Sequence, residues 1–286
     1  MSFFLSLLAA ALYSVSSALL WGTLSRPRLG SASAHDTPVA TSPGDSDSAQ
    51  ARATDHRRMT LAFAAAAVVL HGWVVIHQTG LPRELALPLF TSMAATTLII
   101  VMLHIILCLK QPADYLGIAV YPTAAITLIA SQASGGGTQI IGDAVQIHVF
   151  LSLLAYAVLA LAAAQAILVS IQRHYLSRHK PGGFMRTLPP LDLTERLLFT
   201  LLTAGFILLS MCLASGFFYL EDMFAQHLVH KTALSCIGWA IFGVLLFGRW
   251  QFGWRGKRAV HWTVAGFAIL VLAYFGSKIV LEVFMT

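Results

Sequence analysis

This sequence of 286 residues contains few charged side chains. Only 10% of its residues are charged, whereas about 25% of the residues of a typical soluble domain carry a charge. Hydrophobic residues make up 57% of the chain, and the mean hydropathy is +0.76. So few charges cannot keep this much apolar surface in water, which excludes an ordinary soluble enzyme and a disordered protein. The composition predicts a polytopic membrane protein.

Cysteine is scarce as well, and each of the three cysteines, Cys108, Cys212 and Cys236, lies inside an apolar run. No C-x-x-C pair occurs, which argues against thiol redox chemistry and against covalent attachment of a c-type heme to this chain. The H-E-x-x-H signature of zinc proteases is missing too, and we find no nucleophile–base set or phosphate-binding loop. We therefore expect a protein that is not an enzyme.

Long apolar runs are what the sequence does have. They predict an all-α fold, a polytopic membrane helix bundle of about eight transmembrane helices, because backbone polar groups must be paired inside lipid. The predicted helices lie at about 2–24, 59–79, 87–109, 114–132, 144–171, 194–219, 230–249 and 260–284. The first run has no basic segment before it and is long enough to span, so we do not expect a cleaved signal.

One long segment, residues 25–58, has no periodic apolar face and is rich in Ser, Ala, Asp and Pro. This composition predicts a disordered linker. It divides the chain into a first transmembrane helix at 1–24, the linker at 25–58, and a seven-helix membrane domain at 59–286.

The basic residues predict the orientation of the bundle. If the N-terminus lies outside the cytoplasm, all lysines and arginines except Arg83, Lys231 and Lys278 fall on the inside. The positive-inside rule favours this arrangement, which places both termini outside and the linker in the cytoplasm. The same bias explains the net charge of +6, so we expect the lipid bilayer, and no nucleic acid, as a partner.

Histidine is the polar residue to follow, since the chain has 11. Five histidines fall in the outer half of the predicted bundle or at its outer face: His71, His77, His148, His227 and His230. Ionisable side chains inside a bilayer usually face the interior of a bundle. A neutral imidazole is also an axial ligand for heme iron.

Three interpretations of these histidines are open. In the first they bind heme iron, with His148 and His71 as the more central pair. His227 and His230 are three residues apart and share one face of a helix, so they are further candidates. In the second they make only hydrogen bonds between helices. The third is a zinc site, which needs further ligands such as nearby carboxylates.

Five segments in the second half carry a resemblance to a known family. They are QIHVFLSLLAYAVLALAAAQA at 146–166, LPPLDLTERLLF at 188–199, SGFFYLEDMFAQHLVHKT at 215–232, GRWQFGWRGKRAVHWTVAGF at 248–267 and AYFGSKIVLE at 273–282. In these segments the chain resembles the cytochrome c assembly membrane proteins, the heme-handling CcsA/CcmC-like family, and most closely its YpjD/HemX-type subgroup. The resemblance covers about half of the chain.

The resemblance implies a multi-pass protein of the bacterial inner membrane that binds or handles heme in the outer half of its bundle. It places His148 at the position of an outer-face heme ligand. The cofactor we expect is a non-covalent heme b, and a membrane protein is a possible further partner.

One family motif has changed in this chain. Heme-presenting members carry W-G-x-x-W-x-W-D-P-K in an outer loop, and alignment on Lys231 puts FAQHLVHK in its place. We expect His227 or His230 to replace the lost ligand. The alternative is a non-catalytic structural or regulatory membrane partner protein that has lost heme presentation. A small transporter is less favoured, since no inverted repeat is visible.

Overall fold

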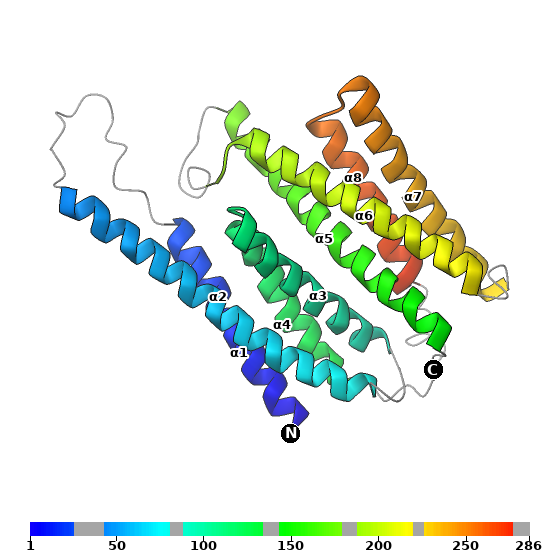
Figure 1. The fold of residues 1–286 in the computed structure, drawn as a ribbon, viewed down its shortest axis with the longest axis horizontal. Coiled ribbons are helices and arrows are strands. Elements are labelled where there is room, and N and C mark those ends of the chain that lie inside the picture. The colour runs from blue at the N-terminus through cyan, green and yellow to red at the C-terminus, as the bar shows by residue number, and fades with distance from the viewer. Residues whose placement is uncertain (26–42, 81–87, 134–142, 179–187, 220–225, 277–286) are drawn as a thin grey trace.

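The computed structural model describes residues 1–25, 43–80, 88–133, 143–178, 188–219 and 226–276, and most of these residues are helical (Figure 1). The helices are α1 (Ser2–Ser25), α2 (Pro43–Thr79), α3 (Leu89–Lys110), α4 (Gly117–Ser131), α5 (Asp143–Ser177), α6 (Leu191–Tyr219), α7 (Gln226–Phe252) and α8 (Lys257–Val271). A short turn, Asp114–Leu116, leads into α4, and a wider turn, Leu272–Gly276, continues α8. No strand occurs in this part of the chain, so the all-α prediction is confirmed.

Seven of the described helices are long and apolar enough to cross a membrane. They are α1, the Thr54–Thr79 part of α2, α3, Asp114–Ser131 with α4, and most of α5, α6 and α7. The eighth helix, α8, has 15 described residues before its wider last turn. The chain is therefore a polytopic helical membrane bundle, as its apolar runs predict.

The helices lie in two groups of four, α1 to α4 and α5 to α8, side by side (Figure 1). Each group has its own core: Tyr13 and Tyr121 are buried in the first, and Leu159, Leu198 and Phe242 in the second. Contacts of α3 with α5 join the two groups. Burial of large apolar and aromatic side chains at helix contacts supplies the dispersion energy that drives helix association in lipid.

Because consecutive helices are antiparallel, basic residues from six helices gather at one end of the bundle, which we call the basic end. Its members include Arg57, Lys110, Arg173, Arg196, Arg249 and Lys257. Our predicted orientation turns this end toward the cytoplasm.

The predicted linker differs from the structure over its second part. Helix α2 begins at Pro43, so residues 43–58 are helical, and the prediction of a disordered linker is wrong for them. The sequence from 50 to 58, QARATDHRR, consists mostly of residues that tolerate a helix well, and it extends a helix already formed by the membrane span. A helix that continues into water needs no apolar face, so the apolar pattern could not indicate it. The first part of the linker, 26–42, lies outside the described residues.

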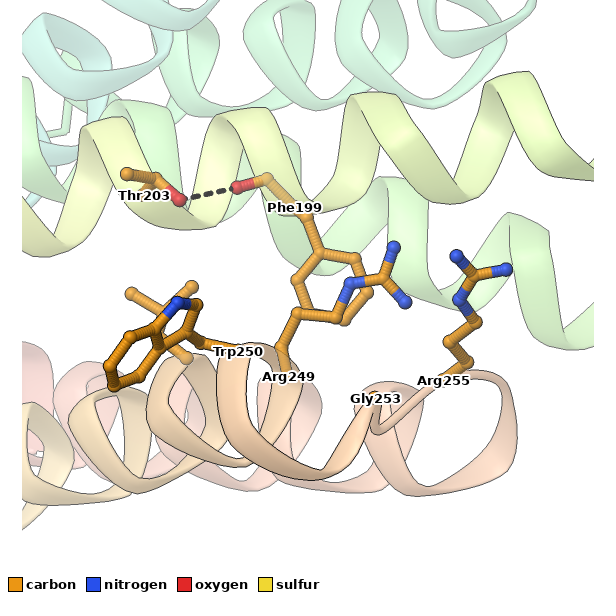
Figure 2. A pocket seen from close by; sticks show the side chains of 7 residues that line it. Phe199, Thr203, Arg249, Trp250, Gly253 and Arg255 are labelled. Atoms are coloured by element: carbon orange, nitrogen blue, oxygen red, sulfur yellow. Dashed lines mark hydrogen bonds between the residues drawn. The ribbon is translucent and has the colours of Figure 1, made fainter.

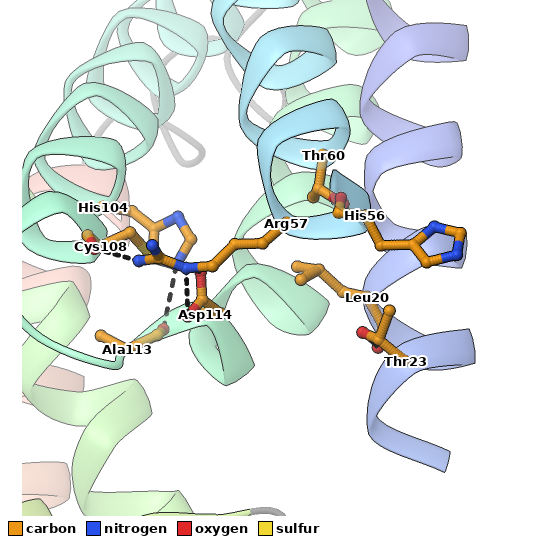
Figure 3. A network of polar contacts seen from close by, with 9 residues as sticks. All are labelled: Leu20, Thr23, His56, Arg57, Thr60, His104, Cys108, Ala113 and Asp114. Carbon is orange, nitrogen blue, oxygen red and sulfur yellow. Dashed lines mark hydrogen bonds and ion pairs between the residues drawn. The ribbon is translucent and has the colours of Figure 1, made fainter. Parts of the chain in front are cut away.

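At the basic end, Arg57 ties α2 to the turn between α3 and α4 (Figure 3). Its Nε donates to both carboxylate oxygens of Asp114, at 3.0 and 3.1 Å, and its Nη2 donates to the backbone carbonyl of Cys108. The last carbonyls of a helix lack partners within the helix, so Arg57 caps the end of α3. His104 strengthens the same turn, since its Nε2 lies 3.2 Å from the carbonyl of Ala113.

We expect Arg57→Ala to destabilise the first group of helices by about 1 kcal/mol, because it removes a partly exposed ion pair and a helix cap together. Thermal unfolding of the detergent-purified protein measures the effect. Arg52→Ala, at an exposed position of the same helix, is the matched control. Equal unfolding temperatures for the two variants contradict the assigned role of Arg57.

Candidate functional site

His148, in the second turn of α5, has a defined hydrogen-bonding geometry. Its Nδ1 lies 3.1 Å from the backbone carbonyl oxygen of Cys212 and 3.0 Å from the hydroxyl oxygen of Ser215, both on α6. The Ser215 hydroxyl donates its own proton to that Cys212 carbonyl, at 2.8 Å. A carbonyl oxygen can only accept, so Nδ1 of His148 must carry the hydrogen.

The tautomer that follows leaves the other ring nitrogen free to bind. In a neutral imidazole with hydrogen on Nδ1, Nε2 keeps its lone pair. The ring is half-buried, and Nε2 has no hydrogen bond within the described part of the chain. Histidines that ligate metals are held in this way, since they donate the second ring N–H to a carbonyl or carboxylate.

Ser152 links α5 to α6 next to the His148 ring. It lies one turn after His148 on α5, and its hydroxyl donates to the His148 backbone carbonyl at 2.7 Å. The same hydroxyl oxygen lies 3.0 Å from Sγ of Cys212. The Ser152–Cys212 contact and the contacts of His148 with Cys212 and Ser215 together fix the rotation of α5 against α6, and with it the direction of the imidazole.

His71, on α2, has different surroundings. It is fully buried, and its Nδ1 lies 3.2 Å from the hydroxyl oxygen of Tyr13 on α1. The Tyr13 and His71 rings meet edge to face, with centroids 5.9 Å apart. No hydrogen bond to Nε2 meets normal geometry among the described residues, although the Ala94 carbonyl lies near the ring. A hydrogen bond with Tyr13 gives this histidine a packing role of its own.

The described contacts do not bring the predicted pair, His71 and His148, together. One ring faces α1 and the other faces α6. Helix α3 packs against both α2 and α5, with Ala94 and Ala95 in a cluster with Val75 and Leu153. The apolar side chains of this cluster lie one turn further along each helix from the two histidines.

His227 and His230 belong to the first turns of α7, and their side chains lie outside the described part of the structure. Helix α6 ends at Tyr219 and α7 begins at Gln226. The start of α7 is thus at the same end of the bundle as His148, the end opposite the basic end (Figure 1). Whether either imidazole reaches toward His148 stays a prediction.

Sequence analysis did not identify Cys212 and Ser215 as partners of His148. They lie three residues apart on α6, so they share a face of the helix. That spacing was the available signal. Within the described residues, no three His, Cys, Asp or Glu side chains are grouped closely enough to hold a metal ion by themselves, which does not favour the zinc interpretation.

Comparison with known proteins relates most of the chain to one family. The family described as Cytochrome C assembly protein matches residues 86–285, a region that includes His148, His227 and His230 and leaves His71 outside. No solved structure matches the chain.

Three curated relatives illustrate the similarity. The "Inner membrane protein YpjD" of Escherichia coli K12 is 40% identical over 134 residues, which are 47% of this chain and 51% of that protein. The "Uncharacterized 28.8 kDa protein in nifR3-like 5'region" of Azospirillum brasilense is 32% identical over 143 residues, 49% of this chain and 53% of that protein. The "Cytochrome c biogenesis protein CcsA" of Prochlorococcus marinus NATL1A is 26% identical over 102 residues, 33% of this chain and 32% of that protein. The chain spans about half the length, or less, of the curated relatives it matches.

Proposed function

The chain belongs to the cytochrome c assembly protein family, and we propose that it binds a non-covalent b-type heme with His148 as an axial ligand. The observation that supports this best is the Nδ1–H of His148 donated to the Cys212 carbonyl, which leaves Nε2 as a free lone pair. The chain is a multi-pass protein of the bacterial inner membrane, consistent with seven candidate spans and the family match.

The protein's own residues would hold and tune the heme. Heme supplies an iron that accepts imidazole nitrogen as an axial ligand. The Cys212 carbonyl and the Ser215 hydroxyl keep the His148 ring in one tautomer and one orientation, and their hydrogen bond makes Nε2 more basic. Apolar helices around the site would exclude water from the macrocycle. We propose ligation and handling of heme, with no reaction of the protein's own.

We propose that His227 or His230 would hold the heme iron together with His148. Both lie at the start of α7, at the same end of the bundle as His148, and both lie in the region that matches the family. His71 is the less supported candidate, because it is fully buried against Tyr13 on the far side of α3.

Single substitutions test the second ligand. We expect hemin bound to His227→Ala or to His230→Ala, whichever removes the ligand, to change from six-coordinate low-spin to five-coordinate high-spin iron, since one axial nitrogen is lost. His71→Ala is expected to leave the spin state unchanged. Absorption and electron paramagnetic resonance spectra of the purified variants report the spin state of the iron. If His71→Ala is high-spin and both other variants stay low-spin, the second ligand is His71, and the assignment to His227 or His230 is wrong.

Ser215→Ala tests how the ring of His148 is held. The variant removes one of the two groups at Nδ1 and keeps the Cys212 carbonyl, so we expect hemin affinity to fall about tenfold, the lower end for a lost partner of a metal-ligating histidine. Hemin titration gives the affinity. Thr200→Ala removes an exposed hydroxyl from the same helix as a control, and an equal effect of both changes argues against an orienting role.

A further inference from the structure

At the basic end, an open hollow of about 550 Å³ lies between α6 and α7, and the heme site does not involve it (Figure 2). A cavity of this size is within the usual range for ligand sites. One wall is apolar, and two arginines close the side near the turn after α7. The residues used below are Phe199, Thr203, Leu246, Arg249, Trp250 and Arg255.

Among the described residues, neither arginine of the hollow forms an ion pair with a carboxylate. Arg249 is held with its guanidinium carbon 4.5 Å from the centre of the Phe199 ring, a cation–π contact that fixes the side chain. The nearest carboxylates on α6 already have partners: Glu195 accepts from Arg173 at 2.9 Å, and Asp192 accepts from Arg196 at 2.8 Å. No carboxylate lines the hollow in the described part of the chain.

The backbone after α7 is shaped to bring Arg255 to this hollow. Gly253 and Gly256 have φ of 64° and 63°, a left-handed conformation that glycine adopts without strain. Between them the Trp254 amide donates back to the Gly248 carbonyl at 3.1 Å. The turn is therefore tight, and it returns Arg255 toward Arg249 instead of extending it away from the bundle (Figure 2).

The apolar wall of the hollow indicates which kind of ligand would bind beside the two arginines. Trp250, which lines the hollow, is 80% exposed, a value that suits lipid contact in a membrane protein. Tryptophan is enriched at the level where bilayer and water meet, and basic side chains pair there with anionic headgroups. The hollow thus combines a cationic rim with an aromatic and aliphatic wall at the membrane surface.

We infer that this hollow binds an anionic phospholipid of the leaflet at the basic end. Its phosphate would lie between Arg249 and Arg255, while Thr203 lies on the far side of the hollow and donates its hydroxyl to the Phe199 carbonyl (Figure 2). Its first acyl segments would pack along Leu246 and Trp250. The same two arginines could hold free phosphate, but the apolar wall would then remain unused.

The test compares two double variants that each lose two charges at the basic end. R249Q/R255Q removes the arginines of the hollow, and R58Q/R178Q removes two exposed arginines outside it. Thermal unfolding of the detergent-purified protein is followed during titration with phosphatidylglycerol, phosphatidylcholine or inorganic phosphate. We expect phosphatidylglycerol to stabilise the wild type and the control, and R249Q/R255Q to need about 30-fold more of it, the loss for two basic contacts to an anionic lipid.

Arg255→Gln alone keeps the Arg249–Phe199 contact and serves if the double variant does not fold; it is expected to need about fivefold more phosphatidylglycerol. The inference is overturned if R249Q/R255Q responds to phosphatidylglycerol like the control. If that variant does not fold, the same response of Arg255→Gln overturns it. Equal stabilisation by phosphatidylcholine also overturns it, because charge is then not recognised. If inorganic phosphate stabilises the protein and phosphatidylglycerol does not, the hollow binds a free anion and the lipid inference is overturned.

Discussion

The His148→Ala variant is expected to lose at least about 100-fold in hemin affinity, the largest effect that we predict for a single side chain. The substitution removes the proposed axial nitrogen itself, whereas loss of a group that only orients a ligand already costs 10- to 100-fold. Titration of the detergent-purified variant with hemin, followed at the Soret band, measures this loss.

Two comparisons separate ligation from a folding defect. His174→Ala changes an exposed histidine near the other end of the same helix and should bind hemin as the wild type does. His148→Gly leaves space at the ring position, so added imidazole should restore the low-spin spectrum. Unchanged hemin affinity in a well-folded His148→Ala protein contradicts ligation by this residue.

The second large effect is expected at Gly205, where α6 packs on a buried side chain of α5. A Cβ atom at Gly205 would lie 2.5 Å from Cδ2 and 2.7 Å from Cγ of Leu159, which is fully buried. Valine there must displace the Leu159 side chain or push the helices apart, and overpacking of this kind costs about 1–3 kcal/mol. We expect Gly205→Val to lower the unfolding temperature clearly and to weaken hemin binding, because His148 depends on the spacing of the same two helices.

Gly22→Val is the matched control, since no atom lies within 4 Å of a Cβ at that position. Thermal unfolding should show a much smaller change for it. Leu159→Ala combined with Gly205→Val should recover part of the loss, because the smaller residue makes room for the larger one. If the two glycine variants unfold at the same temperature, the close approach of α5 and α6 is not what stabilises this region.

The fold was largely predictable because apolar runs dictate helices in a bilayer. The run at 87–109 corresponds to α3 at Leu89–Lys110, and the run at 194–219 corresponds to α6 at Leu191–Tyr219. The helical stretch from Pro43 to residue 58 could not be recognised by this means. It is polar on all sides, and no apolar face distinguishes it from a linker.

Of the candidate site, the sequence predicted only the depth of its residues in the membrane. The position of His148 along its helix was evident from the sequence, but the rotation of that helix was not. Rotation is set by contacts between distant residues, such as Ser152 with Cys212 and Gly205 with Leu159. For the same reason His71 looked like a natural partner for His148, whereas in the structure it faces Tyr13.

The central claim, that the protein binds heme through His148, is tested most directly by the absorption spectrum of the detergent-purified protein, oxidised and then reduced with dithionite. A pyridine hemochrome assay identifies the heme type. The account predicts a Soret band, sharp α and β bands on reduction, and their loss in His148→Ala. A colourless protein that also takes up no added hemin would contradict it.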